Sequence, residues 1–203
     1  MRYRIQAVLI IFGIVLTEVC FLIFIQHKIK EKQQINIREY ANKIDLNEKI
    51  IMDIKCFPIS KKYREQINFE DSYGSYRDNG SHEGCDIMHN DNIAGDIPII
   101  SATDGTITNL GWLYLGGYRV GITSSNGIYY YYAHFDSCAP GLYVGKEVKA
   151  GEFLGFMGNT GEGEEGTKGM FPVHLHFGIY IEDKKGNEST VNPYPYLLKI
   201  NEE

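Results

Sequence analysis

The chain has 203 residues, of which 43% are hydrophobic, and its 26 acidic residues outnumber 20 Lys and Arg to give a formal net charge of −6. This length accommodates one domain of common size together with a shorter N-terminal segment. No basic stripe interrupts the glycine-containing C-terminal part, so the charge pattern argues against nucleic acid as a partner.

The first predicted element is an apolar run from Ala7 to Ile25, whose main polar interruptions are Thr17 and Glu18. It approaches the ~20 residues that a helix needs to span a bilayer. The run does not end in the small-x-small cleavage site of a secretory signal peptide. We therefore expect residues 1–25 to be an uncleaved, single-pass transmembrane anchor, with the membrane as a partner through this one helix.

Residues 26–50 form a polar segment rich in Lys, Glu, Gln, Asn and Ile, without Gly or Pro, which favours a helical stalk or linker. Positive charges after the anchor outnumber those before it. This alone favours a cytoplasmic C-terminal part, but the rule weakens when a whole domain follows. Composition then changes, because Gly13 is the one glycine before residue 74 and all six prolines lie at Pro58 or later. Residues 51–203 are therefore predicted to form a separate domain.

Within this domain the hydrophobic residues recur with a period of two rather than 3.6, which is typical of strands. Asp104-Gly105 and Asn126-Gly127 are hairpin turn signals between such runs. The sequence thus predicts a mainly antiparallel β domain. The expected strands cover residues 97–102, 106–110, 118–123, 128–133, 142–144, 153–157 and 173–181.

A pair of histidines one residue apart in the last of these strands is the clearest chemical signal. Alternate side chains of a strand share a face, so His174 and His176 point one way while Leu175 points into a core. Upstream, His82 and Asp86 are four residues apart, an even spacing that also puts them on one face. Two imidazoles and one carboxylate are the ligand set of an open catalytic zinc site.

The other three histidines differ in their surroundings. His134 ends the expected strand 128–133 and should share its face with Tyr132. Together with the four residues above, in one small β domain, it is predicted to line a shared cleft. His27 and His89 have no partner at a suggestive spacing, so we expect them to be solvated or structural.

These residues resemble the lysostaphin-type (LytM-like) zinc metallopeptidases, which cut bacterial peptidoglycan. The resemblance covers roughly residues 78–182. It is carried by His82-x-Gly84-x-Asp86, the stretch from Gly95 to Gly105, Tyr132-Ala133-His134, the turns between Gly151 and Gly161, and His174-Leu175-His176-Phe177. It implies that His82, Asp86 and His176 bind Zn2+ and that His134 and His174 assist catalysis.

The resemblance also implies a chemistry and a location. Zinc held by three protein groups lowers the pKa of its water to about 7 and polarises the scissile carbonyl, and a nearby imidazole shuttles a proton or stabilises an oxyanion. The expected substrate is a peptide of peptidoglycan, and envelope proteins are further candidate partners. A cell-wall substrate places the domain outside a bacterial cell membrane, with the N-terminus in the cytoplasm.

Two alternatives remain at the level of sequence. A set of two histidines and one carboxylate also occurs in non-haem iron oxygenases, but only the ligand count favours iron, whereas two further histidines favour hydrolysis. The second alternative is a catalytically silent or inhibited relative that serves as a scaffold in envelope or sporulation morphogenesis. The complete metal motif argues against it, while an anchored and stalked architecture suits it.

Two features depart from the family pattern. The segment from Glu162 to Val173 is longer than expected and predicts an acidic surface loop. A sharper hypothesis is that this loop overhangs the groove and either selects substrate or blocks the zinc with a glutamate. Gly178 stands where relatives often carry an acid, which puts a hydrogen bond to a metal ligand in doubt.

The four cysteines give limited information about disulfide bonds. Cys20 lies in the expected anchor, and Cys56, Cys85 and Cys138 allow one internal disulfide at most, with the pair left open. Cys85 alternates away from Asp86 and is expected to pack in the core rather than to bind metal.

Overall fold

A computed structural model describes residues 2–77, 80–183 and 185–202, except the side chains of residues 2–16, 18 and 19. The chain divides into two compact units, Met1–Glu48 and Lys49–Glu203, and each is described by itself. The division into an anchor (1–25), a stalk (26–50) and a domain (51–203) remains a prediction.

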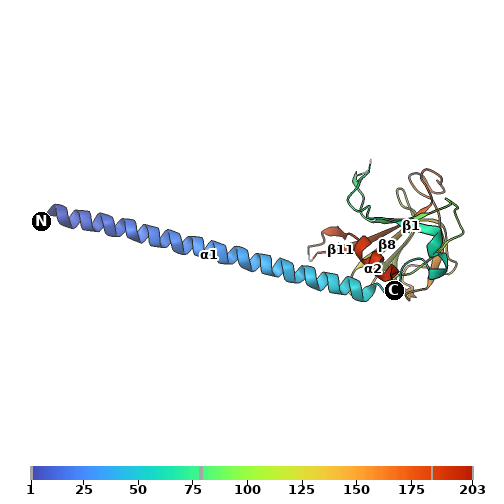
Figure 1. The fold of residues 1–203 in the computed structure, drawn as a ribbon, viewed down its shortest axis with the longest axis horizontal. Coiled ribbons are helices and arrows are strands. Elements are labelled where there is room, and N and C mark those ends of the chain that lie inside the picture. The colour runs from blue at the N-terminus through green and yellow to red at the C-terminus, as the bar shows by residue number, and fades with distance from the viewer. Residues whose placement is uncertain (1, 78–79, 184, 203) are drawn as a thin grey trace. The chain divides into compact units, whose positions relative to one another are not determined.

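Helix α1 runs from Arg2 to Asp53 and contains the whole segment that composition predicts to be helical (Figure 1). Residues 26–50 lack Gly and Pro, so every residue there can donate its backbone N–H and none strongly favours a turn. Nζ of Lys28 and Oε2 of Glu31, one turn apart, form an ion pair at 2.8 Å. The polar composition of this segment is therefore compatible with an uninterrupted helix.

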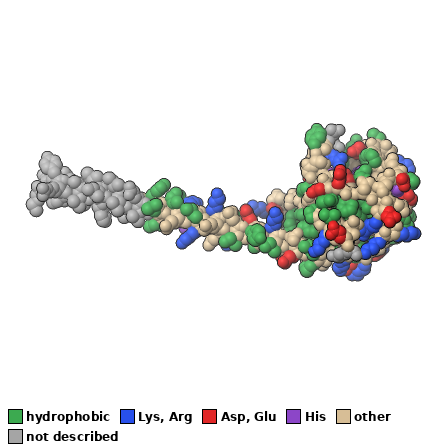
Figure 2. Space-filling view, in the orientation of Figure 1, with side chains coloured by type: hydrophobic (Ala, Val, Ile, Leu, Met, Phe, Trp, Pro, Cys, Tyr) green, Lys and Arg blue, Asp and Glu red, His purple; other side chains and the backbone are tan. Residues whose placement is uncertain are grey.

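The single-pass membrane location predicted from residues 7–25 is corrected by the structure. Among the residues that it describes, no helix is both long and apolar enough to cross a membrane. Most side chains of the expected anchor lie outside the described part of the chain. The described apolar run from Cys20 to Ile25, exposed next to the grey atoms of Figure 2, is followed directly by the polar Gln26, His27 and Lys28.

The second unit is built on an antiparallel sheet (Figure 1). Its strands are β1 (Ile67–Phe69), β4 (Cys85–His89), β5 (Pro98–Ile100), β6 (Gly105–Leu113), β7 (Gly117–Thr123), β8 (Tyr129–Cys138), β9 (Glu147–Val148), β10 (Phe153–Met157), β11 (His174–Glu182) and β12 (Glu188–Val191). Their order is β1-β4-β11-β8-β7-β6-β9, with β10 pairing β5 and β8, and β12 pairing β11. The mainly antiparallel β fold predicted from the two-residue period is confirmed.

Smaller elements complete this unit. A 3-10 helix covers Lys61–Gln66, the short strands β2 (Tyr76–Arg77) and β3 (Gly80–Ser81) form a separate pair, and helix α2 covers Tyr194–Asn201. The β2–β3 pair matters for function, because it leads directly into His82.

One of the two predicted hairpins is present. β7 and β8 are joined through Asn126-Gly127 with Thr123 opposite Tyr129. Gly127 has φ +78°, a left-handed conformation that glycine adopts without a steric penalty. The turn chemistry read from the sequence therefore gives the correct strand pair here.

The hairpin predicted at Asp104-Gly105 is wrong, because β5 pairs with β10 whereas β6 pairs with β7 and β9. The Asp104 carboxylate is used differently: it accepts the Ala150 N–H at 2.8 Å and the Lys55 ammonium at 2.7 Å. The strand predicted at residues 142–144 is also wrong. That stretch is irregular between two glycines with positive φ, and the next strand begins only at Glu147.

The core lies on one face of the sheet and is formed by alternate residues of its central strands. Leu175, Phe177 and Ile179 of β11 are fully buried, as the alternation predicts. Burying each such side chain contributes about 1.5–3 kcal/mol relative to exposure. The buried hydroxyl of Tyr130 is satisfied, since its O–H donates to the Asp53 carboxylate at 3.1 Å. This packing fixes β11 and therefore the direction of the histidines on its other face.

Candidate active site

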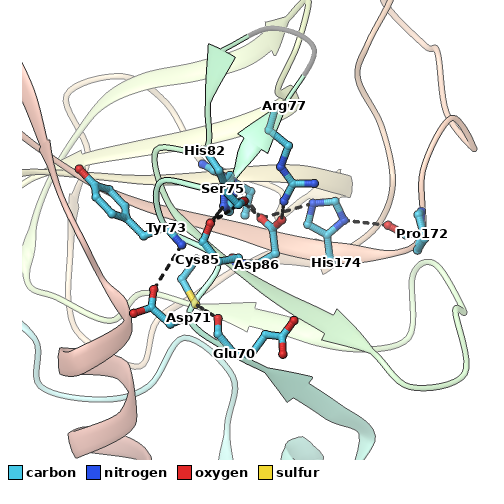
Figure 3. A network of polar contacts seen from close by, with 12 residues as sticks. Glu70, Asp71, Tyr73, Ser75, Arg77, His82, Cys85, Asp86, Pro172 and His174 are labelled. Atoms are coloured by element: carbon cyan, nitrogen blue, oxygen red, sulfur yellow. Dashed lines mark hydrogen bonds and ion pairs between the residues drawn. The ribbon is translucent and has the colours of Figure 1, made fainter.

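The residues of the predicted metal motif come together on the sheet face opposite the core. β4 and β11 pair so that Asp86 lies directly across from His176. His82 follows the β2–β3 pair, where its backbone N–H donates to the Ser75 carbonyl at 2.9 Å. His174 lies two residues before His176 and faces the same way. Figure 3 shows His82, His174 and Arg77 gathered around Asp86.

Three atoms of the type that binds metals converge at this point. Nε2 of His82 lies 3.0 Å from Oδ1 of Asp86, and Nδ1 of His176 lies 3.0 Å from that nitrogen and 3.1 Å from that oxygen. These three residues could hold a metal ion. Tetrahedral zinc with bonds of about 2.0–2.1 Å separates its ligand atoms by about 3.3–3.4 Å, so the observed spacing needs to open by only a few tenths of an ångström.

The position of the ring proton of His82 also favours binding of a cation at this cluster. Its Nδ1 lies 2.9 Å from the carbonyl oxygen of Ser72, which can only accept, so Nδ1 carries the proton. In a neutral ring Nε2 is then a bare lone pair that faces the Asp86 carboxylate and a nitrogen of His176. A cation among Nε2 of His82, Oδ1 of Asp86 and Nδ1 of His176 could be bound by all three atoms. The donor set therefore fits a divalent cation, and two imidazoles with one carboxylate fit zinc.

Asp86 is also held through its second oxygen. Nη2 of Arg77 lies 2.7 Å from Oδ2, which leaves Oδ1 toward the two imidazoles (Figure 3). Burial alone would raise the pKa of Asp86, but the neighbouring imidazoles of His176 and His82 outweigh burial and lower this pKa below its ordinary value. Asp86 is therefore an anion at neutral pH. No spacing or motif in the sequence marks Arg77 as part of this site.

His134 reaches the site through a feature that strand alternation does not predict. The register of the β7–β8 pair shifts, so that Ala133 and His134 of β8 together lie opposite Arg119 of β7. This arrangement is a β-bulge, and His134 adopts φ +66° within it. A bulge re-aims the side chain of the strand that carries it.

The expectation that His134 shares the face of Tyr132 is therefore wrong. Tyr132 is fully buried in the core. The ring of His134 instead lies with its centroid 4.7 Å from that of His174 and 6.0 Å from that of His176. The structure thus brings together all five residues singled out in the sequence, His82, Asp86, His134, His174 and His176.

His134 and His174 are oriented in the same manner. Nδ1 of His134 donates to the Thr160 carbonyl at 2.8 Å, and Nδ1 of His174 donates to the Pro172 carbonyl at 2.7 Å. Burial, followed by the neighbouring imidazoles, lowers the pKa of His134 to about 3, and burial also lowers the pKa of His174. Both rings are neutral at neutral pH with Nε2 unprotonated, and Nε2 of His174 lies 3.7 Å from Oδ1 of Asp86. Each can accept a proton at that nitrogen.

The long segment 162–173 folds onto the turn between β6 and β7. The N–H groups of Glu162 and Gly163 donate to carbonyls of that turn, and the indole N–H of Trp112 donates to the Gly163 carbonyl at 3.1 Å. The segment ends by placing the ring of Phe171 4.5 Å from His134 and 5.2 Å from His174. The ligand cluster contains no glutamate of this loop, so the structure does not support the hypothesis of a glutamate on the zinc.

Two glycines shape the space around His176. A Cβ on Gly84 would lie 2.5 Å from Cε1 of His176 and 2.7 Å from the Phe177 carbonyl oxygen, so only glycine lets this ring lie against the strand. At Gly178, where relatives often carry an acid, a Cβ would meet the ring of Tyr180 at 2.6 Å. Tyr180 therefore fills the space that a larger side chain would need.

The remaining predictions concern residues outside the cluster. His89 is buried, with Nε2 2.9 Å from Oδ1 of Asp96, and His27 is exposed, in agreement with structural and solvated roles. The described cysteines are all free, and Cys85 is fully buried in the core, as its alternation predicts.

The five residues line a groove of about 1220 Å³. Small-molecule sites typically enclose about 300–1,000 Å³, so this groove has room for a longer ligand such as a peptide. Its floor is aromatic: the ring of Tyr131 lies 5.9 Å from that of His176 and 5.9 Å from that of Tyr180.

Comparison with known proteins places this geometry in a family. The sequence matches the model of Peptidase family M23 over residues 80–193, a range that contains all five residues of the cluster. The chain belongs to peptidase family M23. The lysostaphin-type resemblance stated from the sequence motifs is thereby confirmed.

Named relatives of this M23 chain are endopeptidases. It is 35% identical over 145 residues to an L-Ala–D-Glu endopeptidase of Bacillus subtilis, a match that covers 70% of this chain and 42% of that protein. It is 30% identical over 130 residues to the glycyl-glycine endopeptidase ALE-1 of Staphylococcus capitis, a match that covers 62% of this chain and 32% of that protein. The M23 chain thus spans less than half the length of either relative.

Solved structures show the same fold. A crystal structure from Ruminococcus gnavus, named as a LytM-type glycyl-glycine endopeptidase, matches with a TM-score of 0.70 at 44% identity and covers 81% of this chain and 70% of that one. Lysostaphin from Staphylococcus simulans matches with a TM-score of 0.53 at 26% identity and covers 70% of this chain and 54% of that one.

Proposed function

We propose that this chain is a zinc-dependent endopeptidase that hydrolyses peptide bonds in peptidoglycan stem peptides or cross-bridges. The observation that carries this proposal is the convergence of three lone-pair donors, from His82, Asp86 and His176, beside two neutral histidines in one groove. Family membership and the names of the relatives support the same reaction class.

In this proposal His82, Asp86 and His176 are the metal ligands. Zinc bound there supplies Lewis acidity and a water of lowered pKa. His82 is oriented for this task by the Ser72 carbonyl and Asp86 by Arg77, and such outer contacts fix the direction of a ligand's lone pair.

His134 and His174 are assigned the proton transfers. Each ring is fixed by a backbone carbonyl at Nδ1 and faces the groove with an unprotonated Nε2. A neutral imidazole can take the proton of an attacking water and return it to the leaving amine, and once protonated it can donate to the developing oxyanion. The two rings lie 4.7 Å apart, close enough for both to reach one scissile bond.

The two alternatives raised by the sequence are less well supported. A scaffold has no need of buried lone pairs aimed at one another or of two further neutral imidazoles, and every ligand position is filled here. An iron oxygenase shares only the ligand count. No observation on this chain favours either alternative over hydrolysis.

The test is mass spectrometry of purified peptidoglycan incubated with the zinc-loaded full chain, beside His176→Ala and His134→Ala variants. We expect new peptide ends with the wild type and none with His176→Ala. His134→Ala should retain zinc but lose about 10²–10⁴-fold in rate. Absence of cleavage by wild-type protein with stoichiometric zinc, across several wall types, would contradict the proposal.

A further inference from the structure

The groove extends from the metal cluster across β8 to Arg119 of β7, which also lines it. His176 of β11 pairs with Ala133 of β8, and the β8 bulge at Ala133 and His134 lies opposite Arg119. Neighbouring strands are about 4.8 Å apart, so two strand spacings put the backbone of Arg119 about 10 Å from that of His176. About three residues of extended peptide span this distance.

Most hydrogen-bonding capacity of the Arg119 guanidinium is unused. Nε and Nη1 are buried and have no hydrogen-bond partner among the described residues. The guanidinium interacts with the side chains of Tyr129 and Tyr131. Buried, unpaired donors on a permanent cation are costly, and in native proteins they call for a specific explanation. A carboxylate has the planar shape and the two acceptors that match a guanidinium fork.

Two tyrosines packed against glycines surround Arg119. Tyr129 and Tyr131 lie beside it on β8. Each tyrosine hydroxyl occupies space that is open only because the neighbouring residue is a glycine. A Cβ on Gly121 would lie 2.1 Å from the Tyr129 hydroxyl, and a Cβ on Gly116 would lie 2.0 Å from the Tyr131 hydroxyl. Burial raises the pKa of both tyrosines, so their hydroxyls stay protonated and can donate. This end of the groove is therefore lined by donors.

The groove has a predominantly acidic lining. Its acidic lining residues are Glu70, Glu83, Glu162, Glu182 and Glu188, in addition to Asp86. Among the described lining residues the only other arginine is Arg77, which is engaged with Asp86 at 2.7 Å, and there is no lysine. Among the described side chains that line the groove, Arg119 is therefore the cation available to bind a negatively charged group of a peptide.

We propose that Arg119, with Tyr129 and Tyr131, forms a carboxylate-binding subsite that selects peptides carrying a free carboxylate within about three residues of the scissile bond. This inference rests on the proposed peptidase function and specifies its substrate class. It explains in one step the unpaired guanidinium, the two glycines beside it and the aromatic floor that leads to the metal ligands. Arg119 acts here as a specificity residue, since it lies away from the reacting atoms.

The test uses three synthetic stem tetrapeptides of sequence L-Ala–D-Glu–L-Lys–D-Ala. One carries a free α-carboxylate on D-Glu, one a free C-terminal carboxylate, and one has both groups amidated. Binding is measured by calorimetry on the zinc-loaded full chain with His174→Ala, and recovered peptides are checked by mass spectrometry to be intact. We expect at least one free-acid peptide to bind at least about tenfold more tightly than the diamide, as for a hydrogen-bonded charge pair.

Adding Arg119→Gln should abolish this preference, while Lys62→Gln, which removes an exposed positive charge outside the groove, should keep it. Arg119→Lys keeps the charge without the fork and should retain part of the preference. Circular dichroism and zinc content verify that each variant is folded. Equal binding of all three peptides, no binding of any, or a preference that survives Arg119→Gln would overturn the subsite. Because this readout requires no turnover, its result is separate from the peptidoglycan digestion that tests the peptidase function.

Discussion

Among single residues, Gly84 is predicted to be required for tight zinc binding, because its lack of a side chain leaves room for the ring of His176. Gly84→Ala places a Cβ 2.5 Å from Cε1 of His176 and 2.7 Å from a backbone oxygen that cannot move aside easily. Overpacking of this kind costs about 1–3 kcal/mol, and here it falls on a ligand ring. We therefore expect zinc affinity, measured by competition with a chromophoric chelator, to fall by about tenfold or more.

The matched control for this change is Glu83→Ala, which alters an exposed neighbour on the same turn and should leave zinc affinity close to that of the wild type. Wild-type affinity in Gly84→Ala would show that the His176 ring can shift freely. In that case the close approach seen here is not required for binding.

How far the site follows from the sequence differs from residue to residue. His174 and His176 are two residues apart in one strand, so alternation alone places them on one face. The even spacing of His82 and Asp86 gives the same prediction, although His82 lies before β4 rather than within a strand. The presence of His134 in the same small β domain as the other four residues predicts a shared cleft, but strand alternation places its side chain on the face of Tyr132, and a bulge reverses that placement. The supporting groups, such as the Ser72 carbonyl, are set by tertiary packing and leave no local signal.

At the scale of elements, the loop 162–173 is predicted to act through Phe171. Its ring packs on both neutral histidines and shields them from water. Phe171→Ala should lower kcat about tenfold or more, since general acid–base catalysis depends on imidazole orientation, while zinc content stays unchanged. The measurement is steady-state cleavage of a peptidoglycan peptide beside metal analysis. Met170→Ala, at the exposed neighbouring position, is the control and should behave as wild type. A lower zinc content in Phe171→Ala would assign the loop a role in metal binding instead.

The two predicted hairpin turns differ in outcome. Asn126-Gly127 joins two strands that are also neighbours in the sheet, so local chemistry and global pairing agree. Asp104-Gly105 has similar chemistry, yet β5 pairs with β10, far along the chain. The carboxylate of Asp104 binds Ala150 and Lys55, contacts that a local pattern does not contain. Long-range pairing decides the outcome, and a two-residue motif carries no information about it.

At the scale of the whole molecule, the metal ligands come from parts of the chain that only folding brings together. Asp86 and His176 are separated by 90 positions and meet through the β4–β11 pair. An ion that binds this set therefore binds the folded state and not the unfolded chain. Its binding free energy adds to the stability of the unit that contains the sheet.

The prediction that follows concerns thermal unfolding of the full chain with and without zinc. At a free zinc concentration of 100 times Kd, stability rises by about 2.7 kcal/mol, which for a unit of this size corresponds to about 5–10 °C in Tm. Chelation should reverse the shift, and His176→Ala should show little zinc-dependent change, because it removes one ligand. Calorimetry distinguishes this effect from nonspecific binding, since a surface effect would persist in His176→Ala. A shift of equal size in that variant would contradict the assignment of the ligand set, whereas its loss ties the stabilisation to the three residues that meet only when β4 and β11 are paired.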